Sequence, residues 1–226
     1  NLMNQAPAAE GSGVLGYLLA LPIMGQILFG TFILAIPVIL IWSAKVGNKA
    51  ELQMMMAAMI LIIFNVVFWT LFEQAGSSLT LFADRNTDLS VFGLFTVSAG
   101  QTQFFNPLFI VIFAPIFSIL WTGLARRGLE PGIPVKFALA LMGVGAGFLF
   151  LVWGTQFAGD DFKVAIWWLA GLYLIHSIAE LCISPVGLSS MSKLPPPRLA
   201  GMVMGIWFLG TAIGIYLAGR ATSISS

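Results

Sequence analysis

The segment Phe64–Arg85 reads FNVVFWTLFEQAGSSLTLFADR and carries polar side chains into an otherwise apolar part of the chain. On helical geometry Asn65, Trp69 and Glu73 are spaced by four residues and fall on roughly one face. A carboxylate costs roughly 3 kcal/mol to insert into a membrane helix, so such groups usually face a bundle interior or a water-filled cavity. The segment therefore predicts a membrane helix with a functional polar stripe.

The composition indicates the class of the whole chain. Of 226 residues, 59% are hydrophobic and 8% are charged, and the mean hydropathy is +0.98. Soluble domains carry about 25% charged residues, so we predict an all-α membrane protein with several spans. The net charge of +1 predicts no nucleic-acid partner. With Cys182 and His176 as the single cysteine and histidine, we expect no internal disulfide, no metal site and no cofactor.

Six apolar runs are long enough to cross a hydrocarbon core about 30 Å thick. The first, Val14–Trp42, contains Pro22 and Pro37 and predicts one kinked span, with a hairpin of two short helices as the alternative. The polar residues 1–13 before it lack a basic start and predict neither a signal peptide nor a natural beginning. The other runs are about Leu52–Leu81, Phe104–Leu124, Val135–Gln156, Val164–Met191 and Leu199–Ala218.

The distribution of basic residues predicts the orientation in the membrane. Three of them, with four aspartates, lie on the side that holds the long loop Asp88–Gln103; they are Arg85, Lys163 and Arg220. Seven lie in loops and helix ends on the other side, which we therefore expect to face the cytoplasm: Lys45, Lys49, Arg126, Arg127, Lys136, Lys193 and Arg198.

The fifth apolar run carries a second glutamate at membrane depth. Glu180 has His176 four residues before it and Ser184 four residues after it, so we expect the three on one face. Pro185 removes a backbone hydrogen bond beside them and predicts a bend that suits a binding cavity. The pair Asn106-Pro107 combines an amide with a helix disruption in the same way.

Two further features of the spans are informative. Trp207 lies near the centre of the last span. The glycines Gly143, Gly145 and Gly147 follow no strand, so they predict close helix approach rather than a nucleotide site.

Several motifs together resemble the proton-dependent oligopeptide transporter family, the peptide-transporting branch of the major facilitator superfamily. The likeness covers about residues 50–220. The motifs are FWTLFEQAGSS at 68–78, LFADRN at 81–86, FNPLFI at 105–110, ELCISPVGLS at 180–189 and MGIWFL at 204–209.

The resemblance implies a helical bundle of the major facilitator type, with two six-helix halves that give alternating access to a site between them. The second to sixth spans would be helices seven to eleven. Residues 1–50 would be a polar segment and a helix inserted between the halves, and residues 51–226 the C-terminal half. Helices one to six and helix twelve have no counterpart, so the chain resembles a fragment whose N-terminal half is missing.

The resemblance also implies roles for single residues in proton-coupled symport of di- and tripeptides. Glu180 would pair with the peptide amino terminus, Glu73 would couple protons to transport, and Asp84 would close the outer gate. The other members of the peptide site would be Asn106, Ser184, Trp207 and Trp69.

Alternatives to these roles stay open at this point. Asn106 and Ser184 are also suited to hydrogen bonding between helices, both tryptophans to packing, Asp84 to a local pair with Arg85, and His176 to a structural hydrogen bond. The chain could also belong to a family relative that carries nitrate or another small anion, although Glu180 argues against this. A third possibility is a membrane scaffold subunit that transports nothing.

The sequence shows no nucleophile paired with a base, which would be the sign of an enzyme. The seven-residue turn Phe157–Lys163, where animal relatives carry a large insert, favours a bacterial inner membrane.

Overall fold

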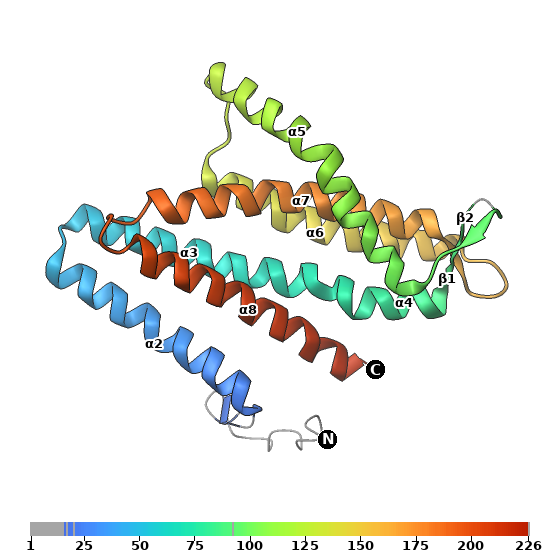
Figure 1. Cartoon of the computed structure of the whole chain (residues 1–226), viewed down its shortest axis with the longest axis horizontal. Coiled ribbons are helices and arrows are strands. Elements are labelled where there is room, and N and C mark those ends of the chain that lie inside the picture. The colour runs from blue at the N-terminus through green and yellow to red at the C-terminus, as the bar shows by residue number, and fades with distance from the viewer. Residues whose placement is uncertain (1–15, 17, 20, 92, 226) are drawn as a thin grey trace.

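The computed structural model describes residues 16, 18–19, 21–91 and 93–225, which form a bundle of long helices (Figure 1). Six helices among these residues are long and apolar enough to cross a bilayer. The prediction of an all-α membrane protein with about six spans is therefore confirmed. The predicted polar segment 1–13 and the beginning of the first apolar run lie outside the described residues.

The elements follow one another through short connections. The long helices are α2 (Ile23–Val46), α3 (Lys49–Phe72), α5 (Phe105–Arg126), α6 (Ile133–Gly154), α7 (Ile166–Lys193) and α8 (Ala200–Ser225). The short elements are η1 (Glu73–Gly76), α4 (Ser78–Asn86), β1 (Thr87–Asp88), β2 (Ser90–Val91), β3 (Phe95–Thr96), η2 (Ala99–Phe104), η3 (Thr155–Phe157) and β4 (Val164–Ala165), where η marks a 3-10 turn.

The first apolar run forms a single helix from Ile23 onward. Helix α2 continues through Gly25, Gly30 and Pro37 without interruption, so these residues make one span and not a hairpin. Its position beside α8 is fixed by a close contact, because Gly25 has no side chain and the Tyr216 hydroxyl takes that space. Phe29 adds an edge-on ring contact with Tyr216.

Successive long helices run in opposite directions along the bundle (Figure 1). One end therefore collects the C-termini of α2, α5 and α7 and the N-termini of α3, α6 and α8. All seven basic residues expected on the cytoplasmic side belong to this end, which we call the basic end. The orientation of that end in the cell stays a prediction.

Helices α6 and α7 pack through glycines. A Cβ added at Gly143 would lie 2.8 Å from the Cβ of Ala179, and one added at Gly147 would meet the His176 ring. Gly145, on another side of α6, has nothing within 4 Å. Two of the three glycines thus allow the close helix approach that the sequence predicts.

Helix α3 and the turn η1 that follows it are joined to α8 by polar contacts as well as by apolar ones. The Asn65 Nδ2 atom donates to the Thr211 Oγ1 atom at 3.0 Å, and the Gln74 Nε2 atom donates to the Ala218 carbonyl at 3.4 Å. A Cβ at Gly214 would lie 2.7 Å from the Cβ of Trp69. The first part of the predicted polar stripe therefore faces α8, and Asn65 connects helices there.

The predicted span Leu52–Leu81 is broken, and the break falls at Glu73. The α-helix ends at Phe72, the 3-10 turn η1 takes the chain to Gly76, and a new helix begins at Ser78. Side chains take backbone acceptors around the interruption, because Gln74 Nε2 donates to the Thr70 carbonyl at 3.2 Å and Thr80 Oγ1 to the Ala75 carbonyl at 2.8 Å. Such local bonds compete with helical ones.

The long loop after α4 is more ordered than the sequence indicates. Strand β1 pairs in parallel with β4, which joins this loop to the turn before α7, and β2 pairs antiparallel with β3. Ser98 and Gln101 then form a capping box that starts η2. The loop therefore fixes where α5 begins.

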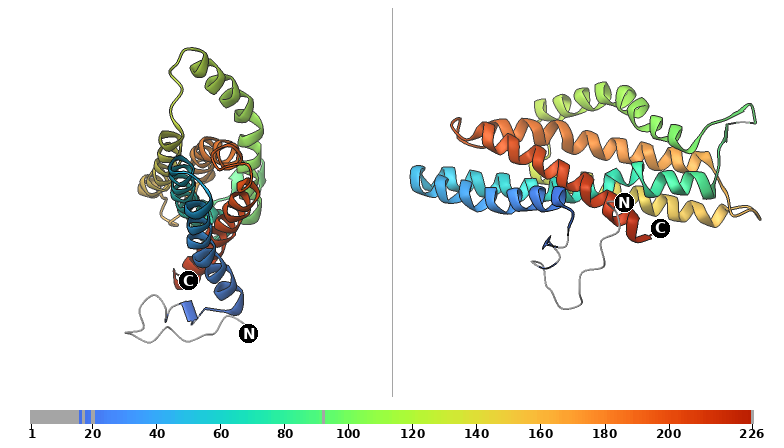
Figure 2. Two further views of the ribbon diagram at one scale, coloured as in Figure 1. Left: turned by 90° about the vertical axis from the view of Figure 1, so that its left-hand side faces the viewer. Right: turned by 60° about the horizontal axis from the view of Figure 1, so that its bottom comes forward.

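Helix α5 is the least buried of the long helices. None of its residues is buried. Its C-terminal half leans away from α6 and α7, as Figures 1 and 2 show. Its first turns contact α7, and this contact contains the polar residues described next.

Candidate functional site

Asn106 is positioned by the start of α5. The chain changes from the 3-10 turn η2 to an α-helix at Phe105, so Asn106 lies in the first α turn. Pro107 follows in the same turn, where a proline sacrifices no helical hydrogen bond. The helix disruption that the sequence predicts at Asn106-Pro107 is thus the change from a 3-10 turn to an α-helix. This change places the Asn106 side chain opposite α7.

Asn106 and Glu180 are brought together, as the resemblance implies for two members of one site. The Asn106 Nδ2 atom donates to Glu180 Oε2 at 3.1 Å and to Ser177 Oγ at 3.1 Å. An ionised carboxylate can only accept, so the amide nitrogen must face it. No described residue engages the Asn106 amide oxygen, which leaves an unused acceptor beside the carboxylate.

Ser177 is a member of this cluster that the sequence analysis missed. Its side chain is fully buried, and its hydroxyl donates to the Tyr173 carbonyl at 2.8 Å while it accepts from Asn106. Its position three residues before Glu180 was a usable signal, since residues three apart share a helix face. Ser177 touches Asn106 and orients its amide.

Ser184 lies further along α7, toward the basic end, and Trp207 lies on α8. The Ser184 hydroxyl is buried and has no hydrogen-bond partner among the described residues. Trp207 is 4% exposed and lies edge-on to Phe137, against the space left by Gly187. In this conformation the Trp207 ring therefore packs between helices.

Trp69 belongs to an aromatic cluster that reaches His176 on α7. Its ring meets Phe68 and Phe72 edge-on, and Phe72 lies 5.8 Å from the His176 ring, centroid to centroid. His176 Nε2 lies 3.1 Å from the Val144 carbonyl, and the whole residue is buried. A structural hydrogen bond is thus what the described contacts of His176 show.

His176 and Glu180 do not share a face as closely as predicted. His176 contacts α6, whereas Glu180 contacts Asn106 on α5. The reason is geometric, because four residues advance an α-helix by slightly more than one turn. This drift turns successive polar side chains of α7 toward different neighbours.

Glu73 lies at the break between α3 and α4, and Asp84 lies beyond it on α4. Glu73 is partly buried in η1 and takes part in no ion pair among the described residues. Asp84 is exposed on α4, away from the basic end, beside the exposed Arg85. Asp84 is therefore not part of the Asn106–Glu180 cluster.

In the part of the chain that the structure describes, we find neither an accessible thiol nor a cluster of metal ligands. Cys182 is a buried free thiol. Within the described ranges there is no group of three or more His, Cys, Asp or Glu side chains that could hold a metal ion.

The described helices form a membrane-length bundle with a polar cluster between α5 and α7. This is the architecture of a multi-pass transporter of the major facilitator type. The chain belongs to the POT family, whose model matches residues 26–226.

Relatives and solved structures agree with this assignment. The chain is 37% identical to the uncharacterized transporter YclF of Bacillus subtilis over 82% of this chain and 37% of that protein. It is 37% identical to dipeptide and tripeptide permease A of Escherichia coli over 87% of this chain and 38% of that protein. A mutant of peptide transporter POT, solved in complex with alafosfalin, matches with a TM-score of 0.75 at 30% identity, over 93% of this chain and 44% of that chain. The chain thus spans less than half the length of these proteins.

Proposed function

We propose that the chain forms the C-terminal half of a proton-coupled symporter for di- and tripeptides, in which a substrate site between two halves opens to each side of the membrane in turn. The family and the permease named above support the substrate class. The observation that carries the proposal is the pair of Asn106 and Glu180, held together by a hydrogen bond on two facing helices.

The chemistry of this pair fits a peptide amino terminus. An ammonium group donates three hydrogen bonds, and the Glu180 carboxylate and the free amide oxygen of Asn106 offer acceptors side by side. Hydrogen bonds to charged groups are worth about 1.5–3 kcal/mol, roughly twice those between neutral groups. We propose that Glu180 binds the amino terminus, while Asn106 and the unpaired Ser184 hydroxyl bind the peptide backbone.

Glu73 is the proposed proton-coupling group. It lies at the interruption between two helices and forms no ion pair within the described residues. A carboxylate in apolar surroundings needs a proton or a cation to be stable. In our proposal a basic group of the other half and a proton alternate at Glu73, and peptide binding at Glu180 favours one of the two states.

The remaining proposed roles concern the walls and the gate. We propose that Trp69, in the aromatic cluster that reaches His176, and Trp207 form walls of the assembled pocket. Asp84 is exposed at the end opposite the basic end, where a basic partner of the other half can reach it. The seven basic residues at the basic end support its location in the cytoplasm, and we propose the bacterial inner membrane as the site of action.

The test is uptake of labelled dialanine into proteoliposomes by the full-length transporter that contains this segment, with and without a pH gradient. The variants are Glu180→Gln and Glu73→Gln, and the matched control is Asp160→Asn, which removes a charge from an exposed loop. Removal of one partner of a buried charge pair costs about 2–5 kcal/mol, so Glu180→Gln should weaken peptide binding at least tenfold. Glu73→Gln should keep peptide exchange and lose gradient-driven accumulation.

Two results would contradict the proposal. Transport of a small anion instead of dialanine would favour the nitrate-type relative. A folded protein that moves no solute, with variants that change only its assembly, would favour a scaffold.

A further inference from the structure

A chain of side-chain hydrogen bonds joins the break after α3 to the start of α5. The Gln103 Nε2 atom donates to Thr80 Oγ1 at 3.0 Å, and Thr80 Oγ1 donates to the Ala75 carbonyl at 2.8 Å. Gln103 lies three residues before Asn106, and Ala75 lies two residues after Glu73. Thr80 therefore stands between the two groups to which the proposed function assigns the peptide and the proton.

Thr80 uses its hydroxyl in both directions. A hydroxyl carries one proton and two lone pairs, so it can accept from the Gln103 amide while it donates to the Ala75 carbonyl. Hydrogen bonds in such a series polarise and strengthen one another. Replacement of Thr80 by valine keeps the shape of the side chain and removes both bonds. The connection can therefore be cut with a single change.

The turn η1 is the element on which Thr80 acts. It is a 3-10 turn between two α-helices, and such interruptions often mark hinges. In a continuous α-helix the Ala75 carbonyl would accept from the amide of Leu79, four residues further on. The Thr80 hydroxyl competes for this acceptor and so favours the interrupted form. The bond from Gln103 helps to hold the Thr80 hydroxyl in this position.

The packing of α4 joins the same two places. Leu79 and Ala83 of α4 are buried in one cluster with Tyr173 of α7, and Phe105 packs against that cluster. Helix α4 also contacts η2 directly, and Figure 1 shows it beside the start of α5. Because close-packed interiors transmit displacements, a shift at the start of α5 is felt by α4.

A second set of hydrogen bonds holds η1 to α8. Gln74 Nε2 donates to the Ala218 carbonyl at 3.4 Å, and Gln74 Oε1 accepts from Ser78 Oγ at 2.7 Å. These bonds keep the turn against α8. Thr80 connects the same turn to the start of α5, so η1 is held between the two helices.

We propose that Thr80 is a positioning residue that transmits peptide binding at Asn106 to the turn that carries Glu73. A peptide that engages the Asn106 side chain moves the start of α5 and, with it, Gln103. The Thr80 hydroxyl then changes its hold on the Ala75 carbonyl, and η1 presents Glu73 in a different position. The inference rests on the proposed function, which supplies both the peptide and the proton.

The test is hydrogen–deuterium exchange of the full-length transporter with and without dialanine, measured in residues 73–80 and 104–112. In the parent, dialanine should slow exchange in both segments, because ligands protect segments whose local opening they oppose. In Thr80→Val, protection of 104–112 should persist and protection of 73–80 should be lost. Thr80→Ser keeps the hydroxyl and should retain the protection of both segments.

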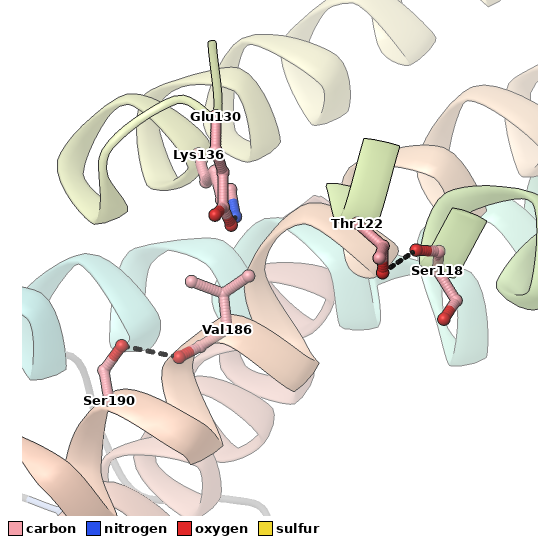
Figure 3. A network of polar contacts seen from close by, with 6 residues as sticks. All are labelled: Ser118, Thr122, Glu130, Lys136, Val186 and Ser190. Carbon is pink, nitrogen blue, oxygen red and sulfur yellow. Dashed lines mark hydrogen bonds and ion pairs between the residues drawn. The ribbon is translucent and has the colours of Figure 1, made fainter. Parts of the chain in front are cut away.

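Thr122→Val is the matched control. Like Thr80, Thr122 donates its hydroxyl proton to a backbone carbonyl at 2.8 Å, that of Ser118 in Figure 3. Among the described residues none donates to Thr122, which lies in the C-terminal half of α5 and away from Asn106. The control should therefore show the same protection as the parent.

Transport provides a second readout. In proteoliposomes, Thr80→Val should lower gradient-driven accumulation of dialanine about fivefold relative to dialanine exchange, which corresponds to about 1 kcal/mol, the net contribution of one hydrogen bond. Gln103→Leu should change the ratio in the same direction. The double variant should match Thr80→Val alone, because the two residues act in one series.

Each possible failure has its own signature. Protection of 104–112 without protection of 73–80 in the parent would leave the site in place and overturn the transmission. Protection of 73–80 that persists in Thr80→Val would mean that the packing of α4 transmits binding without the hydroxyl. Equal losses of accumulation and exchange in Thr80→Val would show a purely structural residue. If the parent binds no dialanine, the proposed function is wrong and this inference falls with it.

Discussion

Helix α7 meets α6 and α5 in two different ways. Toward α6 it packs through glycines, with Gly143 against Ala179 and Gly147 against His176. Toward α5 it is joined by the hydrogen bonds of Asn106, and α5 itself has no buried residue. The α6 interface has no room for movement, whereas the α5 interface holds polar groups that a ligand can engage. The α6–α7 interface therefore supports the fold, and the α5–α7 interface is the proposed site.

The largest effect is expected from overpacking the α6–α7 interface. In Gly147→Leu the new side chain must displace the His176 ring, which is held by Phe148 and the Val144 carbonyl. Overpacking usually costs about 1–3 kcal/mol, and the absence of free space here places the expected loss at the upper end. Thermal unfolding of the purified full-length transporter should show a clearly lower Tm. Gly145→Leu is the control, because nothing lies within 4 Å of Gly145; equal losses in both variants would contradict the distinction.

A smaller effect, of a different kind, is expected from the α5 interface. Asn106→Leu removes the donor to Glu180 and the acceptor beside it. A hydrogen bond to a charged group is worth about 1.5–3 kcal/mol, so dialanine affinity should fall about tenfold or more. Isothermal titration calorimetry measures this change, and the Tm should move less than in Gly147→Leu. Unchanged affinity together with a large drop in Tm would show that Asn106 only connects helices.

The smallest effect is expected from the residue that orients the amide. Ser177→Ala removes one acceptor of Asn106 and should weaken dialanine binding only a few-fold, since one neutral hydrogen bond contributes about 1 kcal/mol. Ser190→Ala is the matched control. Like Ser177 it donates to the carbonyl four residues before it on α7, but it does not touch Asn106. An equal change in both variants would mean that the helix and not the amide is affected.

The sequence was sufficient for the helices but not for their irregular points. Long apolar runs predict spans because hydrocarbon leaves the backbone no other partner than itself. At the interruption after Phe72, the Gln74 and Thr80 side chains donate to backbone carbonyls, and such local bonds compete with a helix that the hydropathy alone favours. Pairing of β1 with β4 joins loops far apart in the chain and has no local signal.

The candidate site was predictable to a similar degree. The motifs led to Asn106 and Glu180, which do meet. Ser177 was missed because a small hydroxyl in an apolar helix is common, although its spacing of three residues from Glu180 was a usable signal; its contact with Asn106 distinguishes it from other such hydroxyls. The burial of Trp207 against Phe137 and Gly187 could not be predicted, since it depends on how three helices pack.

The most direct measurement is hydrogen–deuterium exchange of the full-length transporter with and without dialanine. Ligands protect the segments whose local opening they oppose. Dialanine should slow exchange in residues 104–112, at the start of α5, and leave residues 140–150 of α6 unchanged. Equal protection of both segments, or none at 104–112 while dialanine binds, would contradict the assignment of the site to the α5–α7 interface.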